Sequence, residues 1–280
     1  MHVLATARSL HLSASRVTIA GDWHENSDWA ARAIRTAGRR SPVILHAGDF
    51  GLFDGDYLDA IDDAARDAGV TTLAVTPGNH EDWGLLAGMF AAHPGHAIRV
   101  SGVVWVLPPA FVLTVGGRSV MSLGGAASPN FMSLTRGVDW WPEEVVSDAD
   151  VDRAIRAGWV DIMVTHDAVH YSGIAAVDAV TMGDGGGLPL VAIDYTRAAR
   201  DKITRAYLAI GPTLLFHGHM HIPASSSKPG GRRVFSLGRD GDAIGNLIDV
   251  DLDDLTAAQL HVRESRPQAT APPAAALMWT

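Results

Sequence analysis

The chain has 280 residues, of which 47% are hydrophobic and 19% charged, with a formal net charge of −9 and no cysteine. This composition is typical of a globular chain that can bury a sizeable core, and the lack of cysteine excludes disulfides and thiolate metal sites. The negative charge argues against a large nucleic-acid surface, because such a surface normally needs basic residues to neutralise phosphates.

The N-terminal segment 1–15 is a poor signal peptide, because His2, Arg8 and His11 interrupt it and it contains no continuous apolar core. No apolar run approaches the roughly 18 to 20 residues of a membrane span. These two features predict a cytoplasmic protein without a membrane partner. The oligomeric state is left open.

The first third of the chain alternates strand-like apolar runs with helical patterns. The predicted elements are a strand over 17–20, a helix capped by Ser27 or Asp28 that stops at Gly38, a strand over 43–46, a helix over 57–68 and a strand over 72–75. This βαβαβ order implies parallel strands, and the carboxyl ends of such strands gather ligands at one edge of the sheet.

The middle of the chain is rich in short β segments separated by Ser-Gly, Pro-Pro and Gly-Gly turns. We expect antiparallel strands of a second sheet over 97–100, 103–107, 110–115 and 118–123. A helical pattern over 151–155 and a strand over 160–164 then return to α/β alternation. The Gly-rich segment 172–188 is interpreted as a mobile rim or lid loop, with a plain surface excursion as an equal alternative.

The last part of the chain is expected to contain a helix near 195–210, a strand over 213–216 and closing strands over 232–237, 246–252 and 259–263. Proline and alanine from residue 265 onward predict a disordered tail. The sequence therefore predicts an α/β fold of two packed mixed sheets flanked by helices. We expect one domain over 1–264 and a tail over 265–280.

Five predicted strands end in polar residues that are able to bind a metal. Asp22 and His24 are two positions apart, so in extended backbone both side chains leave the same face. Each motif alone is weak, since an Asp at a strand end is more often a turn or a cap. In chain order the five motifs are Asp22-Trp23-His24, Gly48-Asp49, Gly78-Asn79-His80-Glu81, His166 and His217-Gly218-His219.

This series, D-x-H, G-D, G-N-H-E, H and G-H-x-H, resembles the calcineurin-like metallophosphoesterases over about Val17 to Leu252. The resemblance implies their four-layer sandwich fold and a binuclear metal site. By motif, the first metal would be held by Asp22, His24 and His219, the second by Asn79, His166 and His217, and Asp49 would bridge the two.

The predicted ligand set mixes imidazoles with carboxylates, which suits transition metals better than calcium or magnesium. Manganese is the leading candidate, with iron, zinc or nickel as alternatives. Only two of the seven predicted ligands, Asp22 and Asp49, are anionic. Two divalent ions would therefore leave the site positive, and a small phosphate ester is the expected substrate.

The resemblance also implies a reaction, in which a hydroxide that bridges the two metals attacks phosphorus without a protein nucleophile. His80 would be the catalytic residue, donating a proton to the leaving oxygen or a hydrogen bond to the phosphoryl group. Phe53 stands where the protein Ser/Thr phosphatases of this superfamily carry a phosphate-gripping arginine. We predict a phosphodiesterase for small nucleotide-like substrates, with a phosphomonoesterase or a catalytically silent metal-binding scaffold as alternatives.

Five further residues near the motifs are given structural interpretations. His46 is expected to be a core histidine with satisfied hydrogen-bonding groups, with a hydrogen bond to a metal ligand as the alternative. For His170 and His221 we favour a solvent or rim position over metal ligation. Trp140 and Trp141 are interpreted as packing residues, with a platform for a nucleobase as the alternative.

Overall fold

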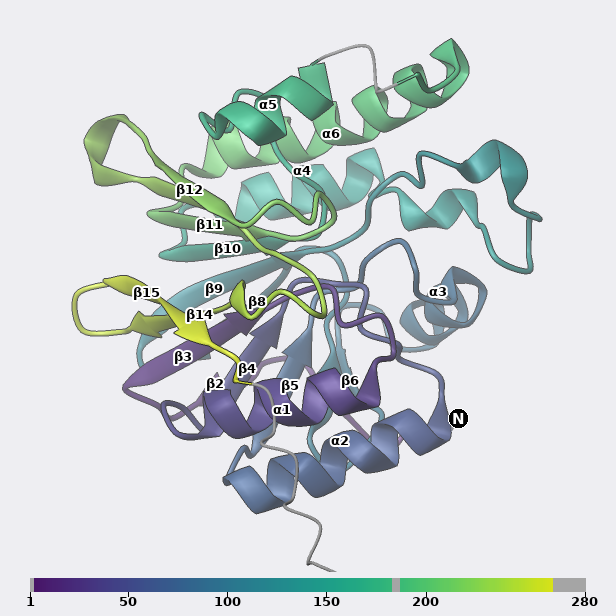
Figure 1. The fold of residues 1–280 in the computed structure, drawn as a ribbon. Coiled ribbons are helices and arrows are strands. Elements are labelled where there is room, and N and C mark those ends of the chain that lie inside the picture. Colours follow the sequence, from purple (N-terminus) through teal and green to yellow (C-terminus); the bar gives the residue numbers. More distant parts are fainter. Residues whose placement is uncertain (1–2, 183–186, 264–280) are drawn as a thin grey trace, which may run out of the picture.

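Two mixed β-sheets pack face to face in the computed structural model, which describes residues 3–182 and 187–263. Helices α1 and α2 cover the outer face of one sheet, and α4, α5 and α6 cover that of the other (Figure 1). The predicted fold of two mixed sheets flanked by helices is confirmed. Among the described residues, no helix is both long and apolar enough to cross a bilayer.

The first sheet has eight strands in the order β1-β6-β7-β5-β4-β3-β14-β15. Its four central strands β7, β5, β4 and β3 are parallel. Strand β6 is antiparallel to β7 and β14 is antiparallel to β3, while the outermost strands β1 and β15 are antiparallel to β6 and β14. The bounds are β1 Ala5–Ala7, β3 Arg16–Ala20, β4 Val43–His46, β5 Thr72–Val75, β6 Ala97–Arg99, β7 Val104–Val106, β14 Ile244–Asp251 and β15 Ala257–His261.

The second sheet has seven strands in the order β12-β13-β11-β10-β9-β8-β2. Strands β13, β11, β10 and β9 are parallel neighbours. Strand β12 is antiparallel to β13, and β8 is antiparallel to β9 and parallel to β2. The bounds are β2 His11–Leu12, β8 Phe111–Val115, β9 Arg118–Leu123, β10 Ile162–Thr165, β11 Leu214–His217, β12 Ala224–Ser227 and β13 Arg233–Ser236.

Local sequence explains where the helices begin and end. Asn26, one residue before the expected caps, accepts a hydrogen bond from the Trp29 N–H, and Gly69 ends α2 in the left-handed conformation with φ 72°. The bounds are α1 Ser27–Gly38, α2 Gly55–Ala68, α3 Trp83–Ala92, α4 Asp148–Ala157, α5 Ala175–Met182 and α6 Leu190–Ile210, with short 3₁₀ turns over Phe131–Ser133, Pro142–Glu144 and Pro229–Gly231.

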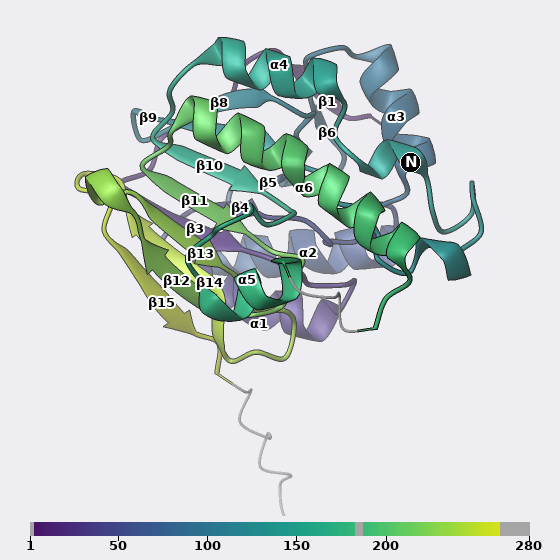
Figure 2. The ribbon, with the colours of Figure 1, turned by 90° about the horizontal axis from the view of Figure 1, so that it is seen from above.

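The core lies in three layers, one between the sheets and one under the helices on each side. Val17, Phe216 and Phe235 belong to the layer between the sheets, while Ile34 and Ile61 join α1 and α2 to the first sheet. Each fully buried side chain of this size contributes about 1.5–3 kcal/mol. Figure 2 shows α6 lying over β10 and β11 with α4 beside it, which forms the third layer.

Three expectations about the elements need correction. Residues 97–99 and 104–106 form β6 and β7 of the first sheet, not strands of the second, because β7 pairs in parallel with β5. Helix α3 was not predicted. Segment 172–188 is not a plain loop, since α5 occupies Ala175–Met182, and its residues 183–186 lie outside the described residues. The predicted tail 265–280 also lies outside them.

Candidate metal centre

The predicted metal ligands gather where parallel strands of both sheets end. Asp22, Asp49 and Asn79 follow β3, β4 and β5 of the first sheet, and His166 and His219 follow β10 and β11 of the second. The five strands consist mostly of buried apolar residues, and the predicted ligands follow where these runs stop. Because the two sheets pack face to face, the ends of their parallel strands bring ligands from distant parts of the sequence to one location.

The first group of ligand atoms comes from Asp22, His24, Asp49 and His221, and all four atoms lie within 4.8 Å of one another. His24 Nε2 is 3.6 Å from Asp49 Oδ2, and His221 Nε2 is 3.6 Å from Asp22 Oδ1. Asp22 Oδ2 and His221 Nε2 are buried without a hydrogen bond. Since orphaned buried polar atoms are costly, this group fits a cation that would satisfy both.

The second group comes from Asp49, His166 and His219, whose ligand atoms also lie within 4.8 Å of one another. His166 Nε2 is 3.1 Å from Asp49 Oδ1 and 3.1 Å from Asn79 Oδ1. The other ring nitrogen, His166 Nδ1, donates to the Ala47 carbonyl oxygen at 2.6 Å. A proton on Nε2 joins these oxygens here, and a metal ion would replace that proton.

Asp49 raises the basicity of the two histidines beside it. Burial disfavours the charged form of His166, but the Asp49 carboxylate outweighs burial and raises the pKa of His166 to about 10. The same balance holds for His24. Burial disfavours its charged form, but hydrogen bonds to Asp49 and Asp240 favour that form and raise the pKa of His24 to about 9. The site therefore favours the binding of cations, because the buried carboxylates of Asp22 and Asp49 need positive partners.

The backbone of the site is held in an uncommon conformation. Asp22, His24, Asp49, His219 and His221 all have positive φ, between 47° and 63°. For non-glycine residues this left-handed region costs of order 1 kcal/mol each and persists only where surroundings enforce it. Such a cluster of strained residues in one place is characteristic of functional sites.

Two glycines make room for the two carboxylates. A Cβ atom at Gly78 would lie 2.2 Å from Asp49 Oδ1, and one at Gly218 would lie 2.3 Å from Asp22 Oδ2. Both distances are far shorter than any real contact, so only glycine permits this close approach. The glycines of the G-N-H-E and G-H-x-H motifs are thus explained by the packing of the site.

Three acidic residues that the sequence analysis did not select orient the site residues. Asp240 Oδ1 is 2.9 Å from His24 Nδ1, which directs the Nε2 atom of that ring toward Asp49. Glu144 accepts hydrogen bonds from the Ser128 N–H and hydroxyl, and Ser128 Oγ in turn accepts from Asn79 Nδ2. Glu81 accepts from the N–H groups of Phe50 and Gly78. No sequence signal short of the fold identifies Asp240 or Glu144.

The structure groups the last histidines differently from the predicted ligand set. His217 belongs to neither group: it is the last residue of β11, is fully buried, and its Nδ1 lies 3.0 Å from the Gly218 carbonyl oxygen. His219 lies with Asp49 and His166 instead of with Asp22 and His24. His221, expected at the rim, belongs to the first group. The sequence contained the signal for His219 and His221, because the residues that match the pattern G-H-x-H are Gly218, His219, Met220 and His221.

His80 lies beside the candidate centre and outside both groups. Its backbone N–H donates to Asp49 Oδ1 at 3.0 Å, while its side chain is 66% exposed with Nε2 4.0 Å from Asp49 Oδ2. The imidazole is thus anchored to the centre through the backbone and free to meet a ligand from solvent.

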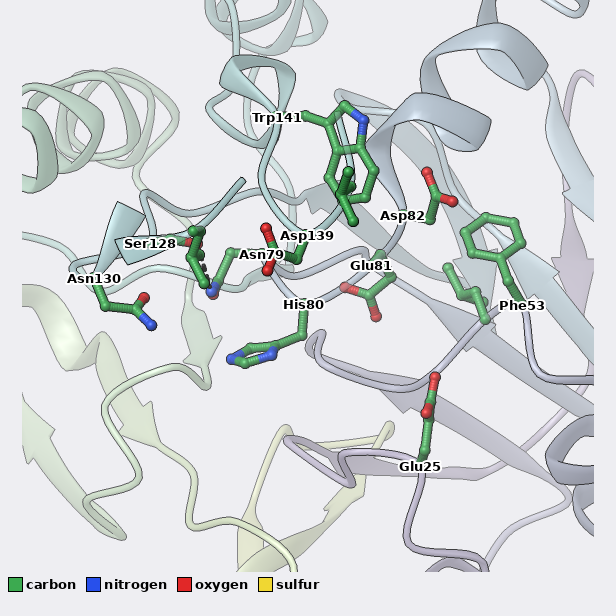
Figure 3. A pocket seen from close by; sticks show the side chains of 13 residues that line it. Glu25, Phe53, Asn79, His80, Glu81, Asp82, Ser128, Asn130, Asp139 and Trp141 are labelled. Carbon is green, nitrogen blue, oxygen red and sulfur yellow. Dashed lines mark hydrogen bonds between the residues drawn. The ribbon is translucent and has the colours of Figure 1, made fainter. Parts of the chain in front are cut away.

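The other singled-out residues occupy less direct positions. His46 is a buried core histidine that packs against Trp23 and Phe50, but neither of its ring nitrogens has a hydrogen-bond partner among the described residues, so it is not the satisfied histidine that was expected. His170 lies 3.2 Å from Asp201, away from the two groups. Trp140 donates to Glu144 and packs against Phe131, which is a packing role. Trp141 instead lines a cavity of about 330 Å³ that also includes Asn79 and His80 (Figure 3).

The comparisons with known proteins support this arrangement. A model of the calcineurin-like phosphoesterase family matches residues 15–223. The protein TT1561 of Thermus thermophilus is similar in structure, with a TM-score of 0.53, 11% identity, and 89% of this chain and 100% of that chain covered. At this identity the likeness shows the fold alone. A search of curated proteins found no match.

Two further solved structures are more distant. A 5'-nucleotidase from Candida albicans has a TM-score of 0.45 at 12% identity, with 94% of this chain and 53% of that chain covered. A protein serine/threonine phosphatase from Saccharomyces cerevisiae has a TM-score of 0.43 at 13% identity, with 94% and 86% covered. Neither adds to the argument. Because the family model spans well over half of the sequence and the site carries the family's motifs, the chain belongs to the calcineurin-like phosphoesterase family.

Proposed function

We propose that the protein is a binuclear metal-dependent phosphodiesterase that hydrolyses small, nucleotide-like phosphodiesters. The observation that carries this proposal is the position of Asp49, whose carboxylate belongs to both groups of ligand atoms. One metal would be held by Asp22, His24, Asp49 and His221. The other would be held by Asp49, Asn79, His166 and His219.

The donor set fits transition metals, because histidine nitrogens outnumber carboxylates, and we keep manganese as the leading candidate over iron, zinc and nickel. When bound, two such ions would supply an activated water and neutralise the charge of the phosphoryl oxygens. The side chains of the protein orient the ligands and hold the cations. Asp240 and Ser128 orient the ligand side chains, and the buried carboxylates hold the cations in place.

His80 is the proposed proton donor. Hydrolysis adds the oxygen of water to phosphorus and breaks the bond between phosphorus and the leaving oxygen, which then needs a proton. His80 fits this role because it is exposed, anchored to Asp49 through its backbone, and lines the cavity in which a leaving group could lie. Its imidazole would give its proton to the leaving oxygen and recover one from solvent.

The preference for diesters over monoesters rests on charge. A monoester carries one more negative charge on phosphorus and would gain most from a nearby arginine or lysine. Phe53 stands at the sequence position of the arginine in the protein Ser/Thr phosphatases, and it lines the same cavity as His80. None of the 13 residues around that cavity is a lysine or arginine. These features support a monoanionic phosphodiester as substrate.

A phosphomonoesterase is the second candidate, and Arg200 is the observation that favours it. Arg200 on α6 is 6% exposed and lines a separate cavity of about 200 Å³ together with His219. Its charge is partly compensated, since Nη1 lies 4.0 Å from Asp167 Oδ1 and Nη2 donates to Thr196. We therefore rank this candidate below the phosphodiesterase.

The test compares bis(p-nitrophenyl) phosphate with p-nitrophenyl phosphate on protein of measured metal content. We expect two metal ions per chain and a higher kcat/KM for the diester. A higher kcat/KM for the monoester would assign the second candidate. Two bound metals with no turnover of either ester would indicate a catalytically silent scaffold.

A further inference from the structure

The cavity beside His80 has a charge pattern that bears on the substrate. Figure 3 shows Trp141, Asp82 and Phe53 toward one side of the cavity, His80 and Asn79 toward another, and Glu25 across from Trp141. Since Asn79 belongs to the candidate metal centre and His80 is the proposed proton donor, this cavity is continuous with the reacting position. A group attached to the phosphorus through the leaving oxygen would occupy it.

Four carboxylates line the cavity. Glu81 is buried and accepts hydrogen bonds from the backbone N–H groups of Phe50 and Gly78, and the other three reach solvent. Glu25 and Asp139 are exposed, and Asp82 is half-buried at the N-terminus of α3. Asp82 Oδ1 accepts a hydrogen bond from the Leu85 N–H at 2.9 Å, and Asp139 Oδ1 accepts one from the Thr135 N–H. In each carboxylate the other oxygen, Oδ2, takes no part in that hydrogen bond. Within residues 3–182 and 187–263, none of the three takes part in an ion pair.

Aromatic side chains form the walls between these carboxylates. Trp141 and Phe53 are both half-buried and pack against the core layer under α1 and α2, which keeps their rings in place. A cavity with aromatic walls, uncompensated carboxylates and no lysine or arginine attracts ammonium groups by charge and by cation–π contact. The same cavity repels a second phosphate or a carboxylate.

We propose that the cavity lined by Glu25, Asp82, Asp139, Phe53 and Trp141 binds a cationic alcohol, so that the preferred substrates are phosphodiesters of an amino alcohol such as a choline or ethanolamine group. This inference rests on the proposed phosphodiesterase activity, and it replaces the nucleotide-like leaving group of that proposal by a cationic alcohol. His80 lies in the same cavity, so the cationic alcohol is the leaving group. Hydrolysis breaks its bond to phosphorus, and His80 protonates the departing oxygen.

A neutral nucleoside is the competing occupant, because its base could also stack on Trp141. A nucleoside would gain contact area but nothing from the negative charge of the three carboxylates. A single exposed carboxylate at about 4 Å from an ammonium group is worth roughly a fivefold change in affinity. Three carboxylates therefore predict a preference of about 10- to 100-fold for a cation over a neutral group of the same shape.

The experiment uses a matched pair of p-nitrophenyl diesters. One carries choline and the other carries 3,3-dimethylbutanol, which replaces the charged nitrogen of choline by carbon at nearly the same size. Consumption of each ester by the metal-loaded protein is followed by ³¹P NMR, so that cleavage of either ester bond is detected. We expect kcat/KM to be about 10- to 100-fold higher for the choline ester. The p-nitrophenyl ester of thymidine 5'-phosphate is the third substrate.

Charge-removing variants identify the carboxylates that are responsible. Asp82→Asn keeps a residue that caps helices well, and Asp139→Asn keeps an oxygen for the Thr135 N–H. We expect the ratio between the two esters to fall roughly fivefold in each single variant and to about fivefold in the double variant, which keeps Glu25. Asp59→Asn is the control, because Asp59 is exposed on α2 outside the cavity, and its ratio should equal that of the wild type.

The outcomes separate this inference from the proposed function. Equal kcat/KM for the choline and dimethylbutyl esters would overturn the cationic pocket while leaving the phosphodiesterase intact. A higher kcat/KM for the thymidine ester than for the choline ester would also overturn it and assign the cavity to a nucleoside. If no diester is cleaved, binding of choline is measured by calorimetry, and saturable binding that Asp82→Asn weakens would support the pocket while the proposed function fails. No binding would overturn both.

Discussion

Asp49 Oδ1 lies 3.1 Å from His166 Nε2, and this contact joins the end of β4 in the first sheet to the end of β10 in the second. Both side chains are buried, so the pair holds together the two halves of the candidate centre. The other oxygen of Asp49 faces His24 at 3.6 Å. One carboxylate therefore contacts a histidine of each group.

This position of Asp49 predicts that Asp49→Asn lowers the metal content at both sites. An asparagine keeps the shape but removes the charge that two cations would share, so affinity should fall at both. Elemental analysis after dialysis should give about two metal ions per chain for the wild type and for Asp59→Asn, and fewer than one for Asp49→Asn. Retention of one full equivalent in Asp49→Asn would contradict a shared ligand.

The histidines after β11 provide a second prediction, in which His221→Ala loses metal and His217→Ala does not. His221 Nε2 lies near Asp22, whereas His217 lies in the core outside both groups. His217→Ala should lower the free energy of unfolding by about 1–3 kcal/mol through the cavity that it leaves. Metal content and urea unfolding are measured on both variants. Loss of metal in His217→Ala alone would restore the ligand set expected from the sequence.

His80→Ala should retain its metals and its fold while kcat falls by roughly 10²- to 10⁴-fold, the usual contribution of a general acid. The loss should be largest for poor leaving groups, because an alkoxide needs the proton and a nitrophenolate does not. Diesters with alkyl and nitrophenyl leaving groups are therefore compared on protein of known metal content. An unchanged rate on the alkyl leaving group would exclude His80 as the proton donor.

Gly218→Ala should damage the first group without touching a ligand. The added Cβ atom would lie 2.3 Å from Asp22 Oδ2, so either the carboxylate or the backbone must move. We expect lower metal content and a loss of stability. Gly88→Ala on α3 is the matched control, since nothing lies within 4 Å of its Cβ position, and it should stabilise the protein by about 0.5–1 kcal/mol. Normal metal content in Gly218→Ala would contradict this account of the glycine.

Asp161 gives a prediction about stability and pH away from the site. Burial opposes its ionisation, but the Ser119 N–H and hydroxyl and the Arg118 guanidinium outweigh burial and lower the pKa of Asp161. A carboxyl whose pKa is lowered on folding stabilises the fold above its unfolded pKa of about 3.9, and this contribution is lost as the pH falls through the folded pKa.

Asp161→Asn should therefore lower the free energy of unfolding at pH 7 by about 1–3 kcal/mol. The difference from the wild type should shrink as the pH falls below about 4, because Asp161 of the unfolded wild type then takes up a proton before Asp161 of the folded protein does. Urea unfolding at steps between pH 7 and pH 3.5 measures both. A difference that grows toward low pH would show that the sign is wrong.

The sequence by itself determined the strands of the candidate site and most of its residues. Apolar runs such as Val43 to Leu45 are buried on both faces, and hydrophobicity is a local property that the sequence displays directly. The polar residues after them could be recognised because a parallel sheet places its strand ends at one edge. Asp22, His24, Asp49, Asn79 and His166 were selected in this way.

Only the tertiary structure decided which residues meet at that edge. His217 is the last residue of β11 and lies in the core, while His219 and His221 reach the site through left-handed turns with φ 63° and 53°. Spacing along an extended strand does not anticipate such turns. Strand pairing is likewise a long-range choice, which placed β7 beside β5 instead of in the second sheet. Asp240 contacts His24 from a segment 216 positions away, and no local pattern marks a charge whose partner is set by the fold.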